Sequence, residues 1–284
     1  MTPLHVEPVW TTPYEETVDA DAVAAYARAT NDPNPRYEDG SAVPPLFTVT
    51  MVLPAHTELH RTGAGRLRIR GATGAVHGQH DVVLHAPVRP GTVLRCSGTT
   101  RSVRRVGRGV LLTQRLVLTD TSDELVVEHL WSTLHIDATT DVELGTPVPD
   151  HSFPEAARAR PLASCVVPVD RDQTYRYAGV SGDRIGHSMS DAVARAEGHP
   201  GKILQGMCTF GLAAGALVDA VAGGDPDRVR RLAVRFSRPA FPGRELEVLA
   251  YDAGRTPDGA QAVAFEALQG DVVVLRHGRI ELAA

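Results

Sequence analysis

A short polar segment carries the residues whose types and spacing could move protons. The segment SGDRIGHS, residues 181–188, holds Asp183, His187 and Ser188. A carboxylate and an imidazole that titrate near neutrality can take a proton from one atom and give it to another. From Lys202 onward an apolar stretch rich in glycine and alanine follows. We predict that this stretch is a helix buried on all sides, so that the acid–base residues lie beside a buried helix.

The composition is that of an ordinary globular protein. Of the 284 residues, 43% are apolar and 22% are charged, and the formal net charge is -5 with a pI near 6.2. Such a charge does not indicate a basic surface that binds nucleic acid. Three cysteines without a CxxC spacing fit a reducing compartment. The N-terminus lacks a leader pattern and no apolar run reaches the ~20 residues of a membrane span, so we predict a cytoplasmic protein with no membrane partner.

Motifs for other chemistries are not found in the sequence. It holds no GxGxxG, GxxxxGK(S/T) or GxSxG pattern. His56 and His60 lie four residues apart, and His77 and His80 three apart, but neither pair has a convincing third metal ligand. We therefore predict no cofactor and no metal, and we interpret these histidines as polar surface or locally bonded residues.

Hydrophobic and turn patterns predict similar elements in the two halves of the chain. In the first half we expect a strand at 14–17, a helix at 19–29 and an apolar helix bent at Pro54, followed by strands at 76–85, 93–103, 110–119 and 125–136. In the second half we expect a short helix at 173–180, the long helix, and strands at 165–169, 229–236, 245–251, 260–268 and 272–282.

Two short matches support an internal repeat. The turn PVRPG at 87–91 has a counterpart, PAFPG, at 239–243. A Tyr-Ala dipeptide is followed by an aspartate at almost the same distance in each half, which pairs Asp32 with Asp183. We therefore predict an α+β fold built from two copies of one unit, each a long helix clasped by an antiparallel sheet.

The boundary between the two units is predicted in a segment rich in proline and alanine. We expect a first unit at residues 1–145, a linker at 146–164, and a second unit at 165–284 that carries the candidate active site.

Four segments of the second half, YAGVSGD, DAVARAEG, ILQGM and RPAFPG, resemble the MaoC-type, or R-specific, hydratase and dehydratase family. The resemblance covers most of residues 170–255, with a fainter similarity in YARATNDPNP, PP-L-F and HAPVRPG of the first half. It implies a double hotdog, with a degenerate site in the first half, where Tyr37 occupies the position of the family histidine. It also implies a hydro-lyase that adds or removes water across the double bond of an acyl thioester of coenzyme A or an acyl carrier protein.

The resemblance further implies which residues form the site. The family loop has the form SGDxNPIH, and Asp183 matches its aspartate. The histidine position falls on Ser188, so that the histidine of this chain, His187, stands one residue earlier. In the family a backbone N–H at the start of the long helix holds the thioester carbonyl, and Gly206 matches that position.

Three neighbouring residues are candidates for substrate binding by the same resemblance. Gln205 replaces the family histidine before the Gly-Met pair, and Met207 belongs to that pair. Lys202, expected in the first turn of the helix, could meet a phosphate of a pantetheine-type ligand.

The departures from the family motif leave alternatives open. Asp183 and His187 form the working pair if the loop aims the imidazole into the site; otherwise Ser188 takes the active position. The chain would then be a repurposed hotdog enzyme that catalyses a cyclisation or isomerisation in a biosynthetic pathway, or a non-catalytic binding subunit. A homodimer is also an option, although a double hotdog already contains the pairing of two units.

Overall fold

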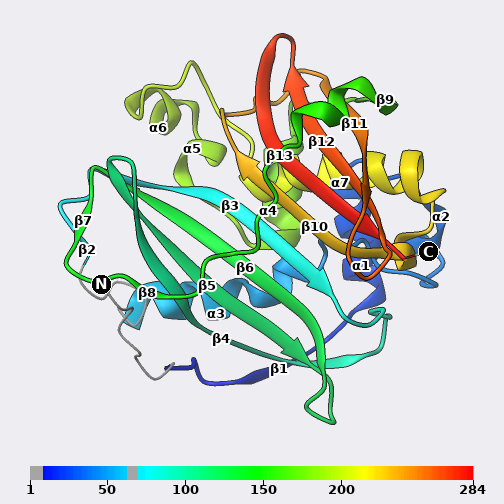
Figure 1. Cartoon of the computed structure of the whole chain (residues 1–284), viewed down its shortest axis with the longest axis horizontal. Coiled ribbons are helices and arrows are strands. Elements are labelled where there is room, and N and C mark those ends of the chain that lie inside the picture. The colour runs from blue at the N-terminus through cyan, green and yellow to red at the C-terminus, as the bar shows by residue number, and fades with distance from the viewer. Residues whose placement is uncertain (1–8, 63–68, 284) are drawn as a thin grey trace. The chain divides into compact units, whose positions relative to one another are not determined.

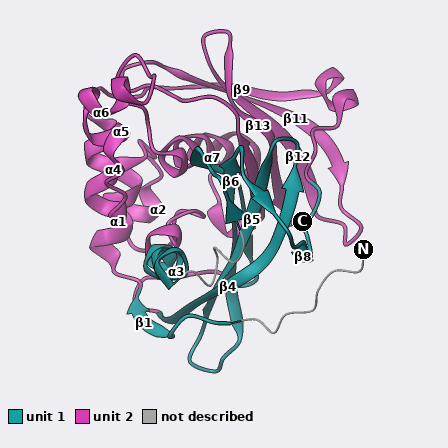
Figure 2. Cartoon of the chain, turned by 90° about the vertical axis from the view of Figure 1, so that its left-hand side faces the viewer, with its two compact units in different colours: residues 1–17, 51–86, 93–150 teal, residues 18–50, 87–92, 151–284 magenta. Residues whose placement is uncertain are grey.

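Packing divides the chain into two compact units that are not continuous in sequence (Figure 2). Figure 1 labels their helices and strands. The structure is a computed structural model that describes residues 9–62 and 69–283. Unit 1 comprises residues 1–17, 51–86 and 93–150, and unit 2 comprises residues 18–50, 87–92 and 151–284. Residues 18–50 therefore pack with the second half of the chain. The domain boundaries given above remain a prediction.

Within the described residues, unit 1 is an antiparallel sheet with five strands in its main path, a short strand paired to β4, and one long helix against it. The helix is α3 (Val49–Thr62), which contains Pro54 as predicted and whose Leu59 lies close to Gly98 of the sheet. The strand order is β1 (Tyr14–Thr17), β4 (Val93–Val106), β5 (Gly109–Thr119), β6 (Leu125–Ile136) and β3 (Gly74–Leu84). Three two-residue strands, β2 (Ile69–Arg70), β7 (Thr139–Thr140) and β8 (Leu144–Gly145), complete the unit.

A histidine cluster lies between α3 and the sheet of unit 1. His56 of α3 and His77 of β3 stack on Trp131, with ring centroids 4.0 and 4.2 Å from the indole centroid. Two rings this close to one centroid must lie on its opposite faces. His80 lies opposite Trp131 in the sheet, and its two ring nitrogens lie 3.2 Å from His77 Nε2 and 2.9 Å from His129 Nδ1.

Of the two alternatives predicted for these histidines, surface or local bonding, the contacts confirm local bonding; His80 is fully buried, as is its partner His129. Side chains alternate between the two faces of a strand, so His129 and Trp131 point to the same face, and His80 joins them there by register. That face is covered by α3. In the described part of the chain, no group of three or more potential ligands is arranged to hold a metal ion.

Unit 2 has the same plan of a sheet and a central helix. Its strand order is β10 (Val229–Phe236), β13 (Val272–Leu282), β12 (Gln261–Gln269), β11 (Leu246–Arg255) and β9 (Pro161–Val167), and its central helix is α7 (Gly206–Ala222). The shorter helices are α1 (Ala20–Ala29), α2 (Pro35–Glu38), α4 (Gln173–Ser181), α5 (Gly186–Met189), α6 (Asp191–Ala196), η1 (Glu155–Ala159) and η2 (Pro226–Arg228). These two units confirm the α+β class. No helix of residues 9–62 and 69–283 combines the length and apolar character needed to cross a membrane.

Helix α7 is buried on both sides, which explains its small residues. On the sheet side, the ring of Phe210 packs against phenylalanine rings of β10 and β12. On the other side, a Cβ added to Gly211 would lie 2.8 Å from Thr30, and one added to Gly215 would lie 2.6 Å from Asp32. The glycines therefore let α1 and the loop after it approach the helix closely.

The repeat predicted from the two PxxPG turns is also seen in their hydrogen bonds. Gly91 and Gly243, which end the turns, have φ angles of 84° and 77°, a region that glycine occupies without strain. The N–H of Gly91 donates to Val18, just after β1, and the N–H of Gly243 donates to Val169, just after β9. Each turn thus fixes the chain between the first strand and the first helix of its half.

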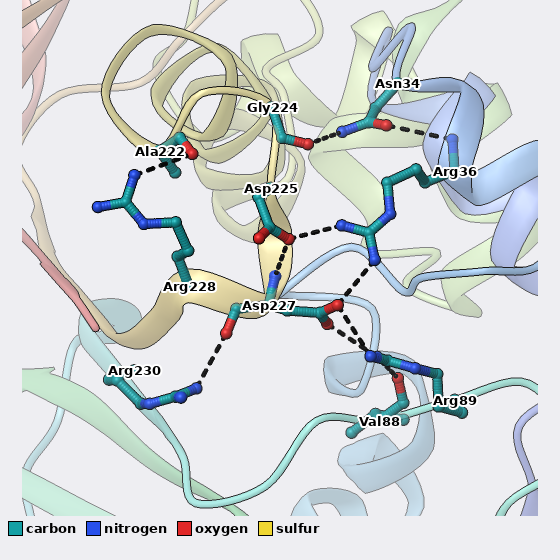
Figure 3. Close-up of polar contacts among 10 residues, drawn as sticks. All are labelled: Asn34, Arg36, Val88, Arg89, Ala222, Gly224, Asp225, Asp227, Arg228 and Arg230. Atoms are coloured by element: carbon teal, nitrogen blue, oxygen red, sulfur yellow. Dashed lines mark hydrogen bonds and ion pairs between the residues drawn. The ribbon is translucent and has the colours of Figure 1, made fainter. Parts of the chain in front are cut away.

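A charged network joins the first-half segments of unit 2 to the end of α7 (Figure 3). Arg89 donates from both terminal nitrogens to the carboxylate of Asp227, at 2.8 Å each. Arg36 donates to Asp225 at 2.5 Å and to Asp227 at 2.7 Å. Two arginines therefore converge on one carboxylate, and they lower the pKa of Asp227 against the opposing effect of its burial.

We expect Asp227→Asn to lower the free energy of unfolding by about 1–3 kcal/mol, because both arginines lose a charged acceptor in a partly buried network. Urea titration followed by circular dichroism measures the change. The matched control is Glu38→Gln, which removes the exposed Arg28–Glu38 pair and should cost less than about 1 kcal/mol. Equal effects of the two variants would contradict a structural role for the network.

Candidate active site

The loop that carries Asp183 begins where α4 ends. Gly182 closes the helix with a left-handed φ of 74°. The hydroxyl of Ser181 accepts the N–H of Asp183 at 3.1 Å, and the Asp183 carboxylate accepts the N–H of Ile185 at 3.3 Å. The carboxylate is half-buried, and burial raises its pKa, although the Ile185 N–H and the nearby His187 oppose this shift. A raised pKa brings this group closer to the neutral range in which an acid can donate a proton.

Gln205 ties this loop to the start of the central helix. Its side-chain Nε2 donates to the carbonyl oxygens of Asp183, at 3.0 Å, and of Thr174 on α4, at 3.1 Å. Gln205 is also the residue immediately before α7. The Asp183 backbone therefore lies beside the N-terminus of the buried helix, as the sequence predicted.

Three buried polar atoms near this junction have no hydrogen-bond partner among the described residues. They are the hydroxyls of Thr174 and Ser188 and Oε1 of Gln205. Buried polar groups are normally bonded to protein or water, so such atoms mark a place where water or a ligand can bind.

The first turn of α7 offers free backbone donors. The first bond within the helix runs from the N–H of Thr209 to the carbonyl of Gln205, so the N–H groups of the three residues between them have no partner in the helix. The Gln205 side chain does not cap them. Gly206 is half-buried, and its Cα packs on Phe236, because an added Cβ would lie 3.2 Å from that ring. The helix dipole adds a positive potential here.

His187 lies on α5, where Nδ1 of its imidazole is 2.7 Å from Oε2 of Glu197. The His187 side chain is 23% exposed. The ring is near enough to Asp183 to lower the pKa of that carboxyl, yet its hydrogen bond goes to Glu197. Ser188, at the position of the family histidine, is fully buried.

The predicted position of Lys202 in the first turn of the long helix is wrong, because α7 begins at Gly206. The amides of Ile203 and Leu204 donate to the carbonyls of His187 and Ala240 instead, which commits this backbone to other segments. Lys202 itself lies over the ring of Tyr175, with Nζ 5.0 Å from its centroid.

The remaining predicted residue, Met207, is 3% exposed and belongs to the core. Its role in substrate binding stays a prediction. Sequence reasoning missed the role of Glu197, which lies ten residues after His187 at the end of α6, within the DAVARAEG segment. It also missed Thr174, whose backbone carbonyl oxygen accepts a hydrogen bond from the side chain of Gln205.

The first-half counterpart of the loop differs in its surroundings. The carboxylate of Asp32 accepts the N–H of Asn34 at 3.2 Å and lies against Gly215, in the middle of α7. Burial raises the pKa of Asp32 to about 6. Tyr37 is buried at the position that would hold the histidine. This half therefore lacks the imidazole of an acid–base pair.

Comparison with known proteins identifies the family. Residues 152–271 match the model of the MaoC like domain, and residues 8–129 match that of the FAS1-like dehydratase domain region. The chain is 30% identical over 217 residues to 3-hydroxyacyl-thioester dehydratase Y of Mycobacterium tuberculosis, which covers 74% of this chain and 73% of the relative. The chain belongs to the MaoC-like dehydratase family. The predictions of a MaoC-like hydro-lyase and of an enzyme are thereby confirmed.

Solved structures of MaoC-like proteins share the fold. The MaoC-like dehydratase from Phytophthora capsici is similar with a TM-score of 0.84 and 20% identity, covering 98% of this chain and 96% of that one. A conserved hypothetical protein of M. tuberculosis, described as a double hotdog, is similar with a TM-score of 0.60 and 13% identity, covering 96% and 95%. The predicted double hotdog is confirmed for this MaoC-like chain.

Proposed function

We propose that this MaoC-like chain adds or removes water across the α,β double bond of an acyl thioester of coenzyme A or an acyl carrier protein. Asp183 and His187 transfer the protons, and the N–H of Gly206 binds the thioester carbonyl. The observation that carries the proposal is the bond from Gln205 to the Asp183 carbonyl, since it joins the acidic loop to the first turn of α7.

The chemistry requires both parts of this junction. Removing a proton from the α-carbon of a 3-hydroxyacyl thioester leaves an enolate, whose negative charge lies mainly on the carbonyl oxygen. Backbone N–H groups at a helix N-terminus stabilise that charge without reorganising. One proton-transfer group takes the α-proton, and the other protonates the departing hydroxyl. Hydration is the same path in reverse.

The direct test is hydration of trans-2-enoyl-CoA substrates of several chain lengths, followed by loss of the enoyl absorbance. Turnover of one or more of them supports the proposal. Absence of turnover across the series, and with carrier-protein thioesters, would exclude it. The homodimer stays a prediction that size-exclusion chromatography with light scattering can measure.

We expect Gly206→Pro to lower kcat by on the order of 10²- to 10³-fold, because it removes one backbone donor. Proline is tolerated at the first residue of a helix, where its missing N–H breaks no helical bond. The preceding Gln205 already has the extended ψ of 139° that proline demands.

The matched control for this variant is Gly206→Ala. It adds the same Cβ against Phe236 but keeps the N–H. A comparable loss of kcat in both variants would mean that packing on Phe236, and not the N–H, is what the glycine provides.

A further inference from the structure

The imidazole of His187 is held by a carboxylate that lies outside the SGDxNPIH form of the family loop. Its Nδ1 lies 2.7 Å from Oε2 of Glu197, which is about 48% exposed. The two residues come from consecutive helical turns, α5 and α6, which share Ser190 as the C-cap of one and the N-cap of the other. No described hydrogen bond joins His187 to the Asp183 carboxylate.

Backbone bonds fix both partners of this pair. The carbonyl of His187 accepts the N–H of Ile203, just before the central helix. The N–H of Glu197 donates to the carbonyl of Val193 and closes α6. The contact therefore joins two anchored positions, which reduces the entropy cost of holding the ring in one orientation.

This contact determines which ring nitrogen carries the proton. An ionised carboxylate only accepts hydrogen bonds, so Nδ1 must be the donor. A neutral imidazole has one N–H, and Nε2 then carries the lone pair. Glu197 bonds to the ring, His187 lies near enough to Asp183 to lower the pKa of that carboxyl, and the ring of His199 lies 6.1 Å away, centroid to centroid.

We propose that Glu197 is a positioning residue that holds His187 as the Nδ1–H tautomer and leaves Nε2 as the proton acceptor of the reaction. This inference rests on the proposed function for its catalytic consequence. It assigns the two roles in the dehydration direction: Nε2 of His187 takes the α-proton, and Asp183 protonates the leaving hydroxyl. The proton gained by the ring and the proton lost by the carboxyl balance when water leaves.

The first test reads the tautomer directly and does not depend on turnover. Nitrogen-15 spectra of the histidine-labelled protein, recorded at a pH where the ring is neutral, distinguish a protonated Nδ1 from a protonated Nε2. The resonances of His187 are those that disappear in His187→Gln. We expect the Nδ1–H form in the wild type, its retention in Glu197→Gln, whose amide oxygen still accepts, and its loss in Glu197→Ala. A protonated Nε2 in the wild type would overturn the proposal.

The second test is kinetic. We expect Glu197→Ala to lower kcat by on the order of 10- to 100-fold with little change in KM, because the ring is misoriented while substrate contacts remain. Glu197→Gln should recover most of the rate. The matched control is Glu38→Gln, which removes another half-exposed carboxylate of unit 2, paired only with Arg28 among the described ion pairs, and should behave as the wild type.

The outcomes separate the two proposals. A wild type that hydrates enoyl thioesters, with Glu197→Ala as active as Glu38→Gln, overturns the positioning role and leaves the proposed function intact. A wild type that turns over no thioester, but whose Nδ1–H tautomer is lost in Glu197→Ala, overturns the proposed function and leaves the ring's orientation by Glu197 supported.

Discussion

Asp183→Asn is expected to lower kcat for enoyl-thioester hydration by on the order of 10²- to 10⁴-fold, the usual contribution of a proton-transfer group. The amide cannot exchange protons with the substrate. Its oxygen can still accept the N–H of Ile185, and the bond from Gln205 to the carbonyl of residue 183 is unaffected. The loop should therefore keep its shape, and KM should change little.

Stability distinguishes this expected loss from misfolding. Because burial raises the pKa of Asp183, its ionised form is less stable in the folded chain than in the unfolded chain. At pH 7 the neutral asparagine should then unfold at the same urea concentration as the wild type or at a higher one. Loss of activity together with a lower urea midpoint would point to a structural role.

The matched control is Asp32→Asn, at the corresponding position of the first half. Asp32 is also partly buried, has a pKa raised to about 6, and accepts the N–H of a residue two positions on. No imidazole stands near it in the family position, since Tyr37 is there. Its substitution should leave kcat within about twofold of the wild type. Equal losses at Asp32 and Asp183 would contradict a single active loop.

The second large effect is expected in unit 1, whose histidine cluster should make its stability fall steeply below pH 6.5. Burial lowers the pKa of His129 to about 3. Burial also lowers the pKa of His80 far below the ordinary 6.5, and electrostatic repulsion from His129 lowers it further. In the unfolded chain these rings bind protons near pH 6.5, so the unfolded state gains more protons on acidification. The contribution of these neutral rings to the free energy of unfolding is therefore complete above pH 6.5 and is lost as the pH falls below it.

The magnitude follows from the two fully buried rings. Between about pH 7.5 and pH 5, each should cost about 2 kcal/mol of unfolding free energy, and together about 4 kcal/mol. That is a large part of the stability of an ordinary domain. His56, whose pKa burial lowers to about 3, and His77 add in the same direction.

Tryptophan fluorescence can measure this effect in unit 1 alone, because both tryptophans of the chain, Trp10 and Trp131, belong to that unit. Urea titrations at about pH 7.5 and pH 5 should show a much lower midpoint in acid. The control is His187→Gln, which removes a histidine of unit 2 and should leave the pH dependence of this signal unchanged. The same midpoint at both pH values would show that the cluster is not held neutral.

Local features of the sequence determined most elements and the place of the active loop. Strand β6 occupies Leu125–Ile136, as its content of valine, leucine and threonine and the turns around it predicted, and the two PxxPG turns make equivalent hydrogen bonds. The SGD and QGM segments indicated that Asp183 lies beside the start of the central helix, where Gln205 donates to its carbonyl. Periodicity, turn residues and motif spacing are all properties of neighbouring residues, so they can be read before the chain folds.

Only the tertiary structure decided the features that depend on distant partners. The start of α7 moved from Lys202 to Gly206 because the intervening amides bond to other segments. The histidines of unit 1 became a buried cluster because register and the cover of α3 bring them together. The pairing of His187 with Glu197 arose in the same way, since it depends on how two helical turns meet. Burial and pairing are set by packing between segments, which local residue patterns do not encode.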